Sequence, residues 1–402
     1  MNSQAHVHHY VPRWYQKRFL RPGQTTFRYL DLHPEIIVND KVRYQRRALL
    51  NWGPARCFYQ NDLYTIRLGN WTSDQIEKRF FGEIDSHGRQ AVQLFSAYSG
   101  YCDGLPDAFR NLTPFMDAQR FRTPRGLDWI RKRADLRSQT QTLMFMQDIF
   151  QLHTTMWVEG EWEIVRAQRS PTKFIVTDEP VTFFNARIFP GESPYPGDFE
   201  LDQCGTRTIF PLGLDSCLII THTQLIRNPW IDPNQSRANA RSFAPTMKHL
   251  LYMQFGRELE EDDVLRINFI LKYRATRYIA AAEEEWLYPE RCASTSNWHS
   301  LDDDWFLFPH LYKVPFTTGI LAGYKDGSRW AQDEYGRQPY HPSYNDENLR
   351  ALEWHTHRLA QIQWAKKRLG RSVAHIDKFE HDEVHDKLMQ DDLAAANRDQ
   401  AS

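Results

Sequence analysis

The chain has 402 residues, of which 50 are Lys or Arg and 51 are Asp or Glu, so its net charge is close to zero. This balance excludes a globally basic protein that its overall field draws to nucleic acid or to an anionic membrane, but local basic patches remain open. The aromatic content of 14% is high enough to fill a large interior and excludes a disordered chain. At this length, one elaborated domain or two closely packed domains are expected.

The cysteines occur singly along the chain, without a C-x-x-C pair. The five positions are Cys57, Cys102, Cys204, Cys217 and Cys292. An odd number of scattered cysteines favours reduced thiols over a disulfide framework or a zinc ribbon. No apolar run approaches the roughly 18 residues that span a bilayer, and the N-terminus lacks the layout of a signal peptide. We therefore predict a soluble, cytoplasmic protein without a membrane partner.

Before residue 73 the chain is predicted to be mostly extended. Pro12 disfavours helical structure before it, and a short helix is predicted for residues 13–20. Residues 25–32 and 34–40 are predicted as strands, with a turn at His33-Pro34 between them.

A helical block is predicted from about residue 73 to 155. Ser73 is a suitable N-cap, and apolar residues follow it at helical spacing. A further helix is predicted from Thr113 and is interrupted before Pro124, and residues 138–153 form another.

Strands and then one long helix are predicted after this block. Short segments rich in Ile, Val and Phe within residues 160–225 predict a mainly antiparallel sheet. Residues 260–285 begin with acids and carry apolar residues at helical spacing, which predicts a helix. We expect an α+β fold in which residues 1–285 form a core, with the central helical block packed on the sheet. Residues 286–402 are expected to add a mixed C-terminal extension, with a hairpin and a helix packed on that core.

Histidines near the N-terminus form the first candidate site. In an extended segment His6 and His8 point to one face and His9 to the other, so the cluster needs remote ligands to complete a metal site. Imidazole titrates near neutral pH and binds Zn, Mn or Fe, which makes these residues candidates for acid–base or metal chemistry. The alternative is that they hydrogen-bond to neighbouring backbone.

The segment QRFRTP provides the second candidate site. Gln119 and Arg122 lie three residues apart, on one face of a predicted helix. A guanidinium beside an amide can clamp a phosphate or a carboxylate. The alternative is that Arg122 forms a structural ion pair with an acid such as Glu77 or Asp85.

Two further stretches contain chemically active residue types. Asp178 follows a predicted strand, where a rigidly held carboxylate suits catalysis or binding, although Thr177 and Asp178 also suit an ordinary turn. HDEVH at 381–385 has the histidine spacing of helical zinc sites, but Asp382 stands in place of the longer glutamate and disfavours that function. The P-loop, dinucleotide-binding, α/β-hydrolase and zinc-finger signatures are missing, so we expect no nicotinamide, flavin or P-loop nucleotide.

In chain order, HHYVPRWYQKRF, NDLYTI, IEKRFFGEIDSHG, QRFRTP and FIVTDEPV resemble the motifs of the mainly bacterial family known as domain of unknown function 4238. The resemblance covers roughly residues 6–285. It carries over to His9, Tyr10, Pro12, Tyr64, Gln119, Arg122, Asp178 and Pro180. The sequence departs from the family pattern at Thr177, where Ser is commoner, and at Asp85, where Glu is more usual and reaches further. The resemblance implies that His9, Arg122 and Asp178 belong to one site.

These residues suggest a metal-dependent phosphodiester hydrolase, either a nuclease or a nucleotide hydrolase. In that hypothesis the catalytic residues are His9, Arg122 and Asp178, the substrate-binding residues are Tyr10, Tyr64 and Gln119, and the ligands of Mg, Mn or Zn are His8 and Asp85. The family type also suggests an effector in bacterial antiviral defence.

Two alternatives need no catalysis. In one, the same motifs form a binding module for a nucleotide, a nucleic acid or a protein, and RYQRR at 43–47 and RKRADLR at 131–137 supply basic patches near aromatic residues. In the other, the motifs form a buried polar network that joins the N-terminal segment to the helical block.

Overall fold

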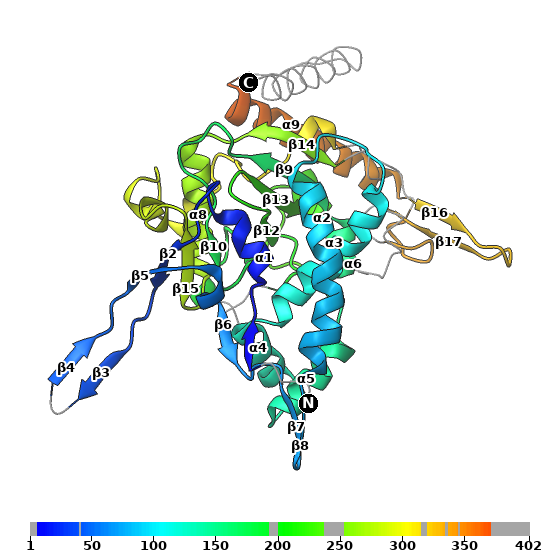
Figure 1. Cartoon of the computed structure of the whole chain (residues 1–402). Helices are drawn as coiled ribbons and strands as arrows, with labels where there is room; N and C mark the ends of the chain where they lie inside the picture. Colours follow the sequence, from blue (N-terminus) through cyan, green and yellow to red (C-terminus); the bar gives the residue numbers. More distant parts are fainter. Residues whose placement is uncertain are drawn as a thin grey trace.

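The computed structural model describes residues 6–39, 42–192, 200–236, 253–314, 320–333, 337–344 and 346–370. The two largest sheets have four and five strands. In the view of Figure 1, the smaller of these and helix α8 lie at the left, the larger lies in the middle, and a group of helices lies at the right. The predicted α+β fold is confirmed.

The N-terminal segment crosses the middle of the molecule. Strand β1 (Val7–His9) pairs antiparallel with β6 (Tyr59–Asn61), and Pro12 precedes α1 (Arg13–Gln16) and the 3-10 turn η1 (Lys17–Phe19). The predicted short helix after Pro12 is therefore present. Tyr15 and Phe19 are completely buried, so the segment is part of the main core.

The four-stranded sheet joins distant parts of the chain. Its order is β10 (Val176–Thr177), β15 (Tyr278–Ala281), β2 (Phe27–Asp31) and β5 (Leu49–Trp52), and all neighbours are antiparallel. Between β2 and β5 the chain leaves the sheet and forms a ribbon of β3 (Ile36–Asn39) and β4 (Val42–Gln45), which projects from the body at the lower left of Figure 1. After the 3-10 turn η2 (Pro54–Arg56) and β6, a second ribbon pairs β7 (Ile66–Leu68) with β8 (Trp71–Ser73).

The predicted helical block is present. It consists of the π-helix η3 (Ile76–Phe81), α2 (Gly82–Ser96), α3 (Leu105–Phe121), α4 (Pro124–Arg133), α5 (Gln139–Asp148) and α6 (Thr154–Glu159). Helix α3 begins at Leu105, earlier than the predicted Thr113, because Pro106 occupies its first turn, where a proline loses no hydrogen bond. Helices α2 and α3 pack closely, since a Cβ at Gly88 would lie 2.5 Å from the ring of Phe115.

The five-stranded sheet follows this block and forms the centre of the core. Its order is β11 (Thr182–Phe184), β12 (Arg207–Pro211), β13 (Ser216–Thr221), β9 (Glu161–Arg166) and β14 (Gln254–Glu258). Every residue of β12 and β13 is buried. The β14–β9 pair is parallel and the other pairs are antiparallel, so the prediction of a mainly antiparallel sheet is confirmed. The short turns η4 (Pro190–Glu192) and α7 (Thr223–Arg227) lie in the connections.

The predicted helix over residues 260–285 is wrong beyond Arg274. Helix α8 covers Glu261–Arg274, and the chain then becomes extended at Ala275 and enters strand β15. The backbone N–H groups of residues 276–278 are bound by the carboxylate of Asp178, and β15 pairs with both β10 and β2. Pairing within the sheet therefore overrides the helical pattern of this segment.

The C-terminal part contains short turns, a hairpin and a long helix. These elements are η7 (Glu285–Leu287), η8 (Pro289–Arg291), η9 (Trp298–Ser300), η10 (Leu311–Lys313), β16 (Ile320–Gly323), β17 (Arg329–Gln332) and α9 (Glu347–Leu369). Helix α9 ends at Gly370, as predicted, and buries Trp364 and Ala365 against Leu311 and Ile226 in a second hydrophobic cluster. The segment HDEVH lies outside the described residues.

The five cysteines are all unpaired, which agrees with the expectation of free thiols. Among the residues that the structure describes, no helix has both the length and the apolar character needed to cross a membrane.

Candidate functional site

The histidines of the N-terminal motif have three different surroundings. His6 is exposed and lies 2.9 Å from a carboxylate oxygen of Asp62. His8 is completely buried, where its Nδ1 accepts the backbone N–H of Tyr64 and its ring stacks on that of Tyr64. His9 is half-buried, and its Nε2 lies 3.3 Å from the carbonyl oxygen of Ala55. Burial is the main cause that lowers the pKa of His9.

Arg122 is the centre of the polar network that the family motifs form. It follows α3 directly, its side chain is 1% exposed, and its two Nη atoms lie 2.7 and 3.2 Å from the carboxylate oxygens of Asp85 on α2. Nη2 also donates to the carbonyl oxygen of His9, and the guanidinium lies 4.6 Å over the ring of Phe81. Arg122 therefore ties α2, α3 and β1 together, as the interpretation of a buried polar network expects.

The tyrosines and the glutamine that we predicted as substrate-binding residues are also buried. Tyr64 donates its hydroxyl to the carbonyl oxygen of Arg122 at 2.6 Å, and its ring packs on that of Phe81. Tyr10 packs edge-on against Phe58, and burial raises its pKa well above the usual value. Gln119 is 1% exposed, and no described residue hydrogen-bonds to either polar atom of its side-chain amide.

Glu77 adds a second carboxylate to the Arg122 network. It lies on the π-helix, a rare conformation that occurs frequently at functional sites. The pKa of Glu77 is raised to about 7, mainly by burial; Arg122 opposes this increase, and the nearby Asp85 and Asp74 add to it. Its Oε2 is buried and has no hydrogen-bond partner within the described part of the chain. The carboxyl group is therefore poised to exchange a proton near neutral pH.

Asp178 is 4% exposed and binds backbone rather than another side chain. Its carboxylate accepts the N–H groups of Thr276, Arg277 and Tyr278 at 2.7 to 2.9 Å. Burial raises the pKa of this carboxyl group, and the three N–H donors oppose the increase. These bonds fix the passage from α8 to β15.

The backbone segments that carry His9, Arg122 and Asp178 do meet. Arg122 binds the carbonyl oxygen of His9, and the hydroxyl of the next residue, Thr123, donates to Glu179 at 2.9 Å. The side chains of Arg122 and Asp178, however, bind different partners, Asp85 and the amides that follow α8.

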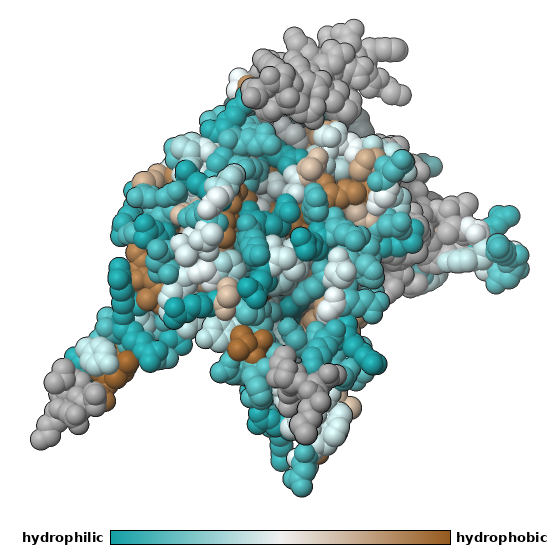
Figure 2. Space-filling view, viewed as in Figure 1, coloured by the Kyte–Doolittle hydropathy of each residue, from teal (hydrophilic) through white to brown (hydrophobic). Residues whose placement is uncertain are grey.

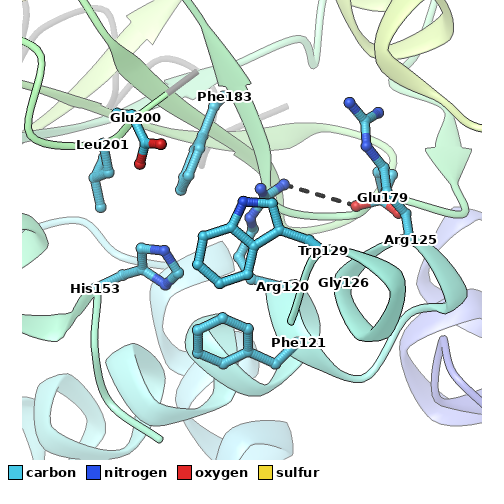
Figure 3. A pocket seen from close by; sticks show the side chains of 10 residues that line it. All are labelled: Arg120, Phe121, Arg125, Gly126, Trp129, His153, Glu179, Phe183, Glu200 and Leu201. Atoms are coloured by element: carbon cyan, nitrogen blue, oxygen red, sulfur yellow. Dashed lines mark ion pairs between the residues drawn. The ribbon is translucent and has the colours of Figure 1, made fainter. Parts of the chain in front are cut away.

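A narrow pocket lies beside the end of α3 and the start of α4 (Figure 3). Its lining residues are Arg120, Phe121, Arg125, Gly126, Trp129, His153, Glu179, Phe183, Glu200 and Leu201. Its cavity volume of about 20 Å³ is sufficient for a water molecule. In Figure 3, His153 lies at one side of the pocket, Trp129, Phe121 and Arg120 lie in the middle, and Glu179 lies at the other side.

His153 is held in this pocket by a buried carboxylate. Its Nδ1 lies 2.7 Å from Oδ1 of Asp117, which is 0% exposed and also accepts the backbone N–H groups of Gln151 and His153. In the neutral tautomer that donates its Nδ1 proton to this carboxylate, Nε2 keeps a lone pair. The ring is packed by Phe121 and Phe183. This is the arrangement of a general base that a carboxylate orients.

A fixed guanidinium lies in the same pocket. Arg120 lies 4.1 Å over the ring of Phe183, donates to the carbonyl oxygen of Val181, and lies 3.7 Å from Oε2 of Glu179 (Figure 3). Gly126 allows the start of α4 to lie close to the end of α3, since a Cβ at this position would lie 2.0 Å from the carbonyl oxygen of Arg120.

His153 and Asp117 are not among the site residues predicted from the sequence motifs. They lie 36 residues apart, and neither belongs to a motif with a recognised spacing. The available signal was Asp117 itself, a charged residue between the apolar Met116 and Ala118 in a helix, because a carboxylate in such a position needs a buried partner.

No group of three or more His, Cys, Asp or Glu side chains within the described residues is arranged to hold a metal ion. His8 and Asp85, the proposed metal ligands, are engaged by the Tyr64 amide and by Arg122.

The fold and these sites define an α+β protein with a histidine–carboxylate pair in its helical block. Residues 7–154 match a family described as Protein of unknown function (DUF4238), so the predicted resemblance to that family is confirmed over this segment. The match includes the Arg122 network and the Asp117–His153 pair, and it ends before Asp178. No curated protein and no solved structure matches the chain.

Proposed function

We propose that this protein is a phosphodiester hydrolase in which His153 is the general base. The observation that carries the proposal is the Asp117–His153 pair, which lies beside Arg120 in one narrow pocket that has room for a water molecule. A nuclease or a nucleotide hydrolase remains the most concrete version, with a role in bacterial defence as its biological context.

The chemistry needs a base, a nucleophile and positive charge. His153 Nε2 takes a proton from a water molecule while the oxygen of that water bonds to phosphorus. The P–O bond to the leaving group then breaks, and His153 gives the same proton to the leaving oxygen. The guanidinium groups of Arg120 and Arg125 stabilise the charge on the phosphoryl oxygens. Glu179 holds Arg120 in place through an ion pair at 3.7 Å.

Arg122 has a different role in this proposal from the one that its motif suggested. Its Nη donors are used by Asp85 and His9, so it positions the end of α3, on which Arg120 lies. His9 and Asp178 stay candidates for the same reaction, and the assay below tests whether the reaction needs a divalent metal.

The test compares His153→Gln with the wild type and with His87→Gln, which changes an exposed histidine on α2. Initial rates are measured on bis(p-nitrophenyl) phosphate, single- and double-stranded DNA, RNA and nucleotides, with EDTA or with Mg, Mn or Zn. We expect His153→Gln to reduce turnover by about 10²–10⁴-fold, which is the usual contribution of a general base, while the protein stays folded because the glutamine amide can donate to Asp117. His87→Gln should retain the wild-type rate.

Equal rates in the wild type and His153→Gln, or no turnover on any of these substrates, would overturn the proposal. If nucleotides raise the melting temperature of the wild type without being hydrolysed, the alternative of a binding module is supported. His9→Ala and Asp178→Ala belong in the same assay, because a loss of turnover without unfolding would return them to the active site.

A further inference from the structure

The ribbon of β3 and β4 projects from the body as an arm (Figures 1 and 2). Its register places Val38 opposite Arg43 and Ile37 opposite Tyr44. Directly opposite residues share a face of a two-stranded ribbon, so one face carries Val38 with Arg43 and the other carries Ile37 with Tyr44.

The arm exposes side chains that a protein normally buries. Val38 is 69% exposed, Ile36 50% and Tyr44 49%. Figure 2 shows hydrophobic residues, in brown, on the surface of the arm. Exposed apolar and aromatic side chains on an isolated ribbon indicate a binding partner.

The charge of the arm identifies the kind of partner. Arg43 and Arg47 are exposed and have no carboxylate partner among the described residues, and neither does Arg28 on β2 at the base of the arm. Arg46 pairs with Glu35, which also pairs with Arg277. Because the whole chain has a net charge of −1, these unpaired arginines form a local basic surface rather than part of a general positive charge.

We infer that the β3–β4 arm binds duplex DNA, with the ribbon in the major groove. The major groove of B-form DNA admits a two-stranded ribbon, whereas that of A-form RNA is too narrow for side chains to read. Arg43 and Arg47 contact phosphates, and Tyr44 and Val38 contact sugars and thymine methyl groups. The inference deepens the proposed function, on which it rests for the phosphodiester class of the partner, by naming DNA as the substrate that the arm holds.

The test is a binding measurement that needs no turnover. The His153→Gln protein is the background, and the arm variant adds Arg43→Ala and Arg47→Ala. The matched control adds Arg89→Ala and Arg110→Ala, which remove the same charge from α2 and α3. Fluorescence anisotropy of a labelled 25-base-pair DNA duplex, and of the same sequence as duplex RNA, gives Kd at several salt concentrations.

We expect the arm variant to raise Kd for DNA at least about tenfold at 0.1 M salt and to reduce the slope of log Kd against log salt by about two. The control variant should bind as the background does, and RNA should bind more weakly than DNA. Equal losses in the arm and control variants, equal affinity for RNA, or no DNA binding would overturn the inference. So would an arm variant that binds DNA normally but changes the molar mass measured by light scattering, because the arm would then contact a second copy.

The two proposals can fail separately. DNA binding that depends on the arm, without turnover in the wild type, contradicts the hydrolase and retains the arm. Turnover that depends on His153, without an effect of the arm variant on Kd, contradicts the arm and retains the hydrolase.

Discussion

Arg122 and Asp85 form a two-bonded ion pair in which the guanidinium is 1% exposed and the carboxylate side chain is 22% exposed. The pair is therefore asymmetric, because water reaches one partner and not the other. Removing one member of such a pair leaves the other charge without its partner, and the cost depends on which charge is left in the interior.

Asp85→Ala should accordingly destabilise the protein. The substitution leaves the buried guanidinium of Arg122 without its carboxylate, and we expect the free energy of unfolding to fall by about 3 kcal/mol, the lower end of the range for a broken buried pair. Urea denaturation followed by circular dichroism measures the change. Asp107→Ala breaks the exposed pair with Arg110 and should cost less than about 1 kcal/mol. Equal losses in the two variants would show that Arg122 does not depend on Asp85.

Asp178→Ala should also destabilise the protein, through backbone groups rather than through a charge pair. The substitution leaves the N–H groups of residues 276–278 without acceptors, and each orphaned donor costs about 1–3 kcal/mol. Asp178→Asn keeps one acceptor oxygen and should lose less. Hydrogen exchange at residues 276–281, measured by mass spectrometry, should become faster in Asp178→Ala. As a control, Asp326→Ala removes a carboxylate that caps an exposed turn and should leave exchange at residues 276–281 unchanged. Unchanged exchange in Asp178→Ala would contradict the role of the Asp178 carboxylate.

The same region shows how far local sequence patterns predict this fold. The helical block and the antiparallel sheet follow from hydrophobic periodicity, because each element buries one continuous face. Residues 275–285 have helical periodicity too, yet Tyr278–Ala281 form a strand between β10 and β2. The carboxylate that stops the helix comes from Asp178, about 100 residues earlier, and no local pattern contains that contact.

The candidate site was likewise predicted only in part from the sequence. Short motifs identified Arg122 and offered Asp85 as its partner, and the structure shows that pair. They did not identify the Asp117–His153 pair, because a helix and a later turn bring these residues together and neither has a distinctive neighbour in sequence. Motif spacing therefore located the polar network, whereas packing created the pocket.

Gly126→Ala should disturb both the Arg122 network and the pocket that holds His153. A Cβ at this position would lie 2.0 Å from the carbonyl oxygen of Arg120, so the start of α4 must move away from the end of α3. We expect a loss of about 1–3 kcal/mol, as for other overpacked sites, and a lower rate wherever His153 supports turnover. Thermal unfolding measures the first effect. Gly323→Ala is the matched control, because a Cβ there meets no atom within 4 Å, and it should change neither the stability nor the rate. A melting temperature of Gly126→Ala equal to that of Gly323→Ala would refute the close contact between Gly126 and Arg120.

Glu77 should make the stability of the protein depend on pH near neutrality. Burial raises its pKa to about 7 in the folded protein, from 4.5 in the unfolded chain, so the folded state binds the proton more tightly. Stability therefore falls as pH rises from about 4.5 to 7 and changes little beyond, with a total loss on the order of 3 kcal/mol. In Glu77→Gln this loss should disappear, so that the variant is more stable than the wild type at pH 8 but not at pH 4.5.

Urea denaturation at several pH values between 4.5 and 8 measures this dependence for the wild type, Glu77→Gln and Glu83→Gln. Glu83 is exposed in the first turn of α2, so its substitution should leave the wild-type pH dependence in place. A Glu77→Gln profile that is parallel to the wild-type profile would show that Glu77 keeps an ordinary pKa. In that case the π-helix places this carboxyl group in water rather than in the Arg122 network.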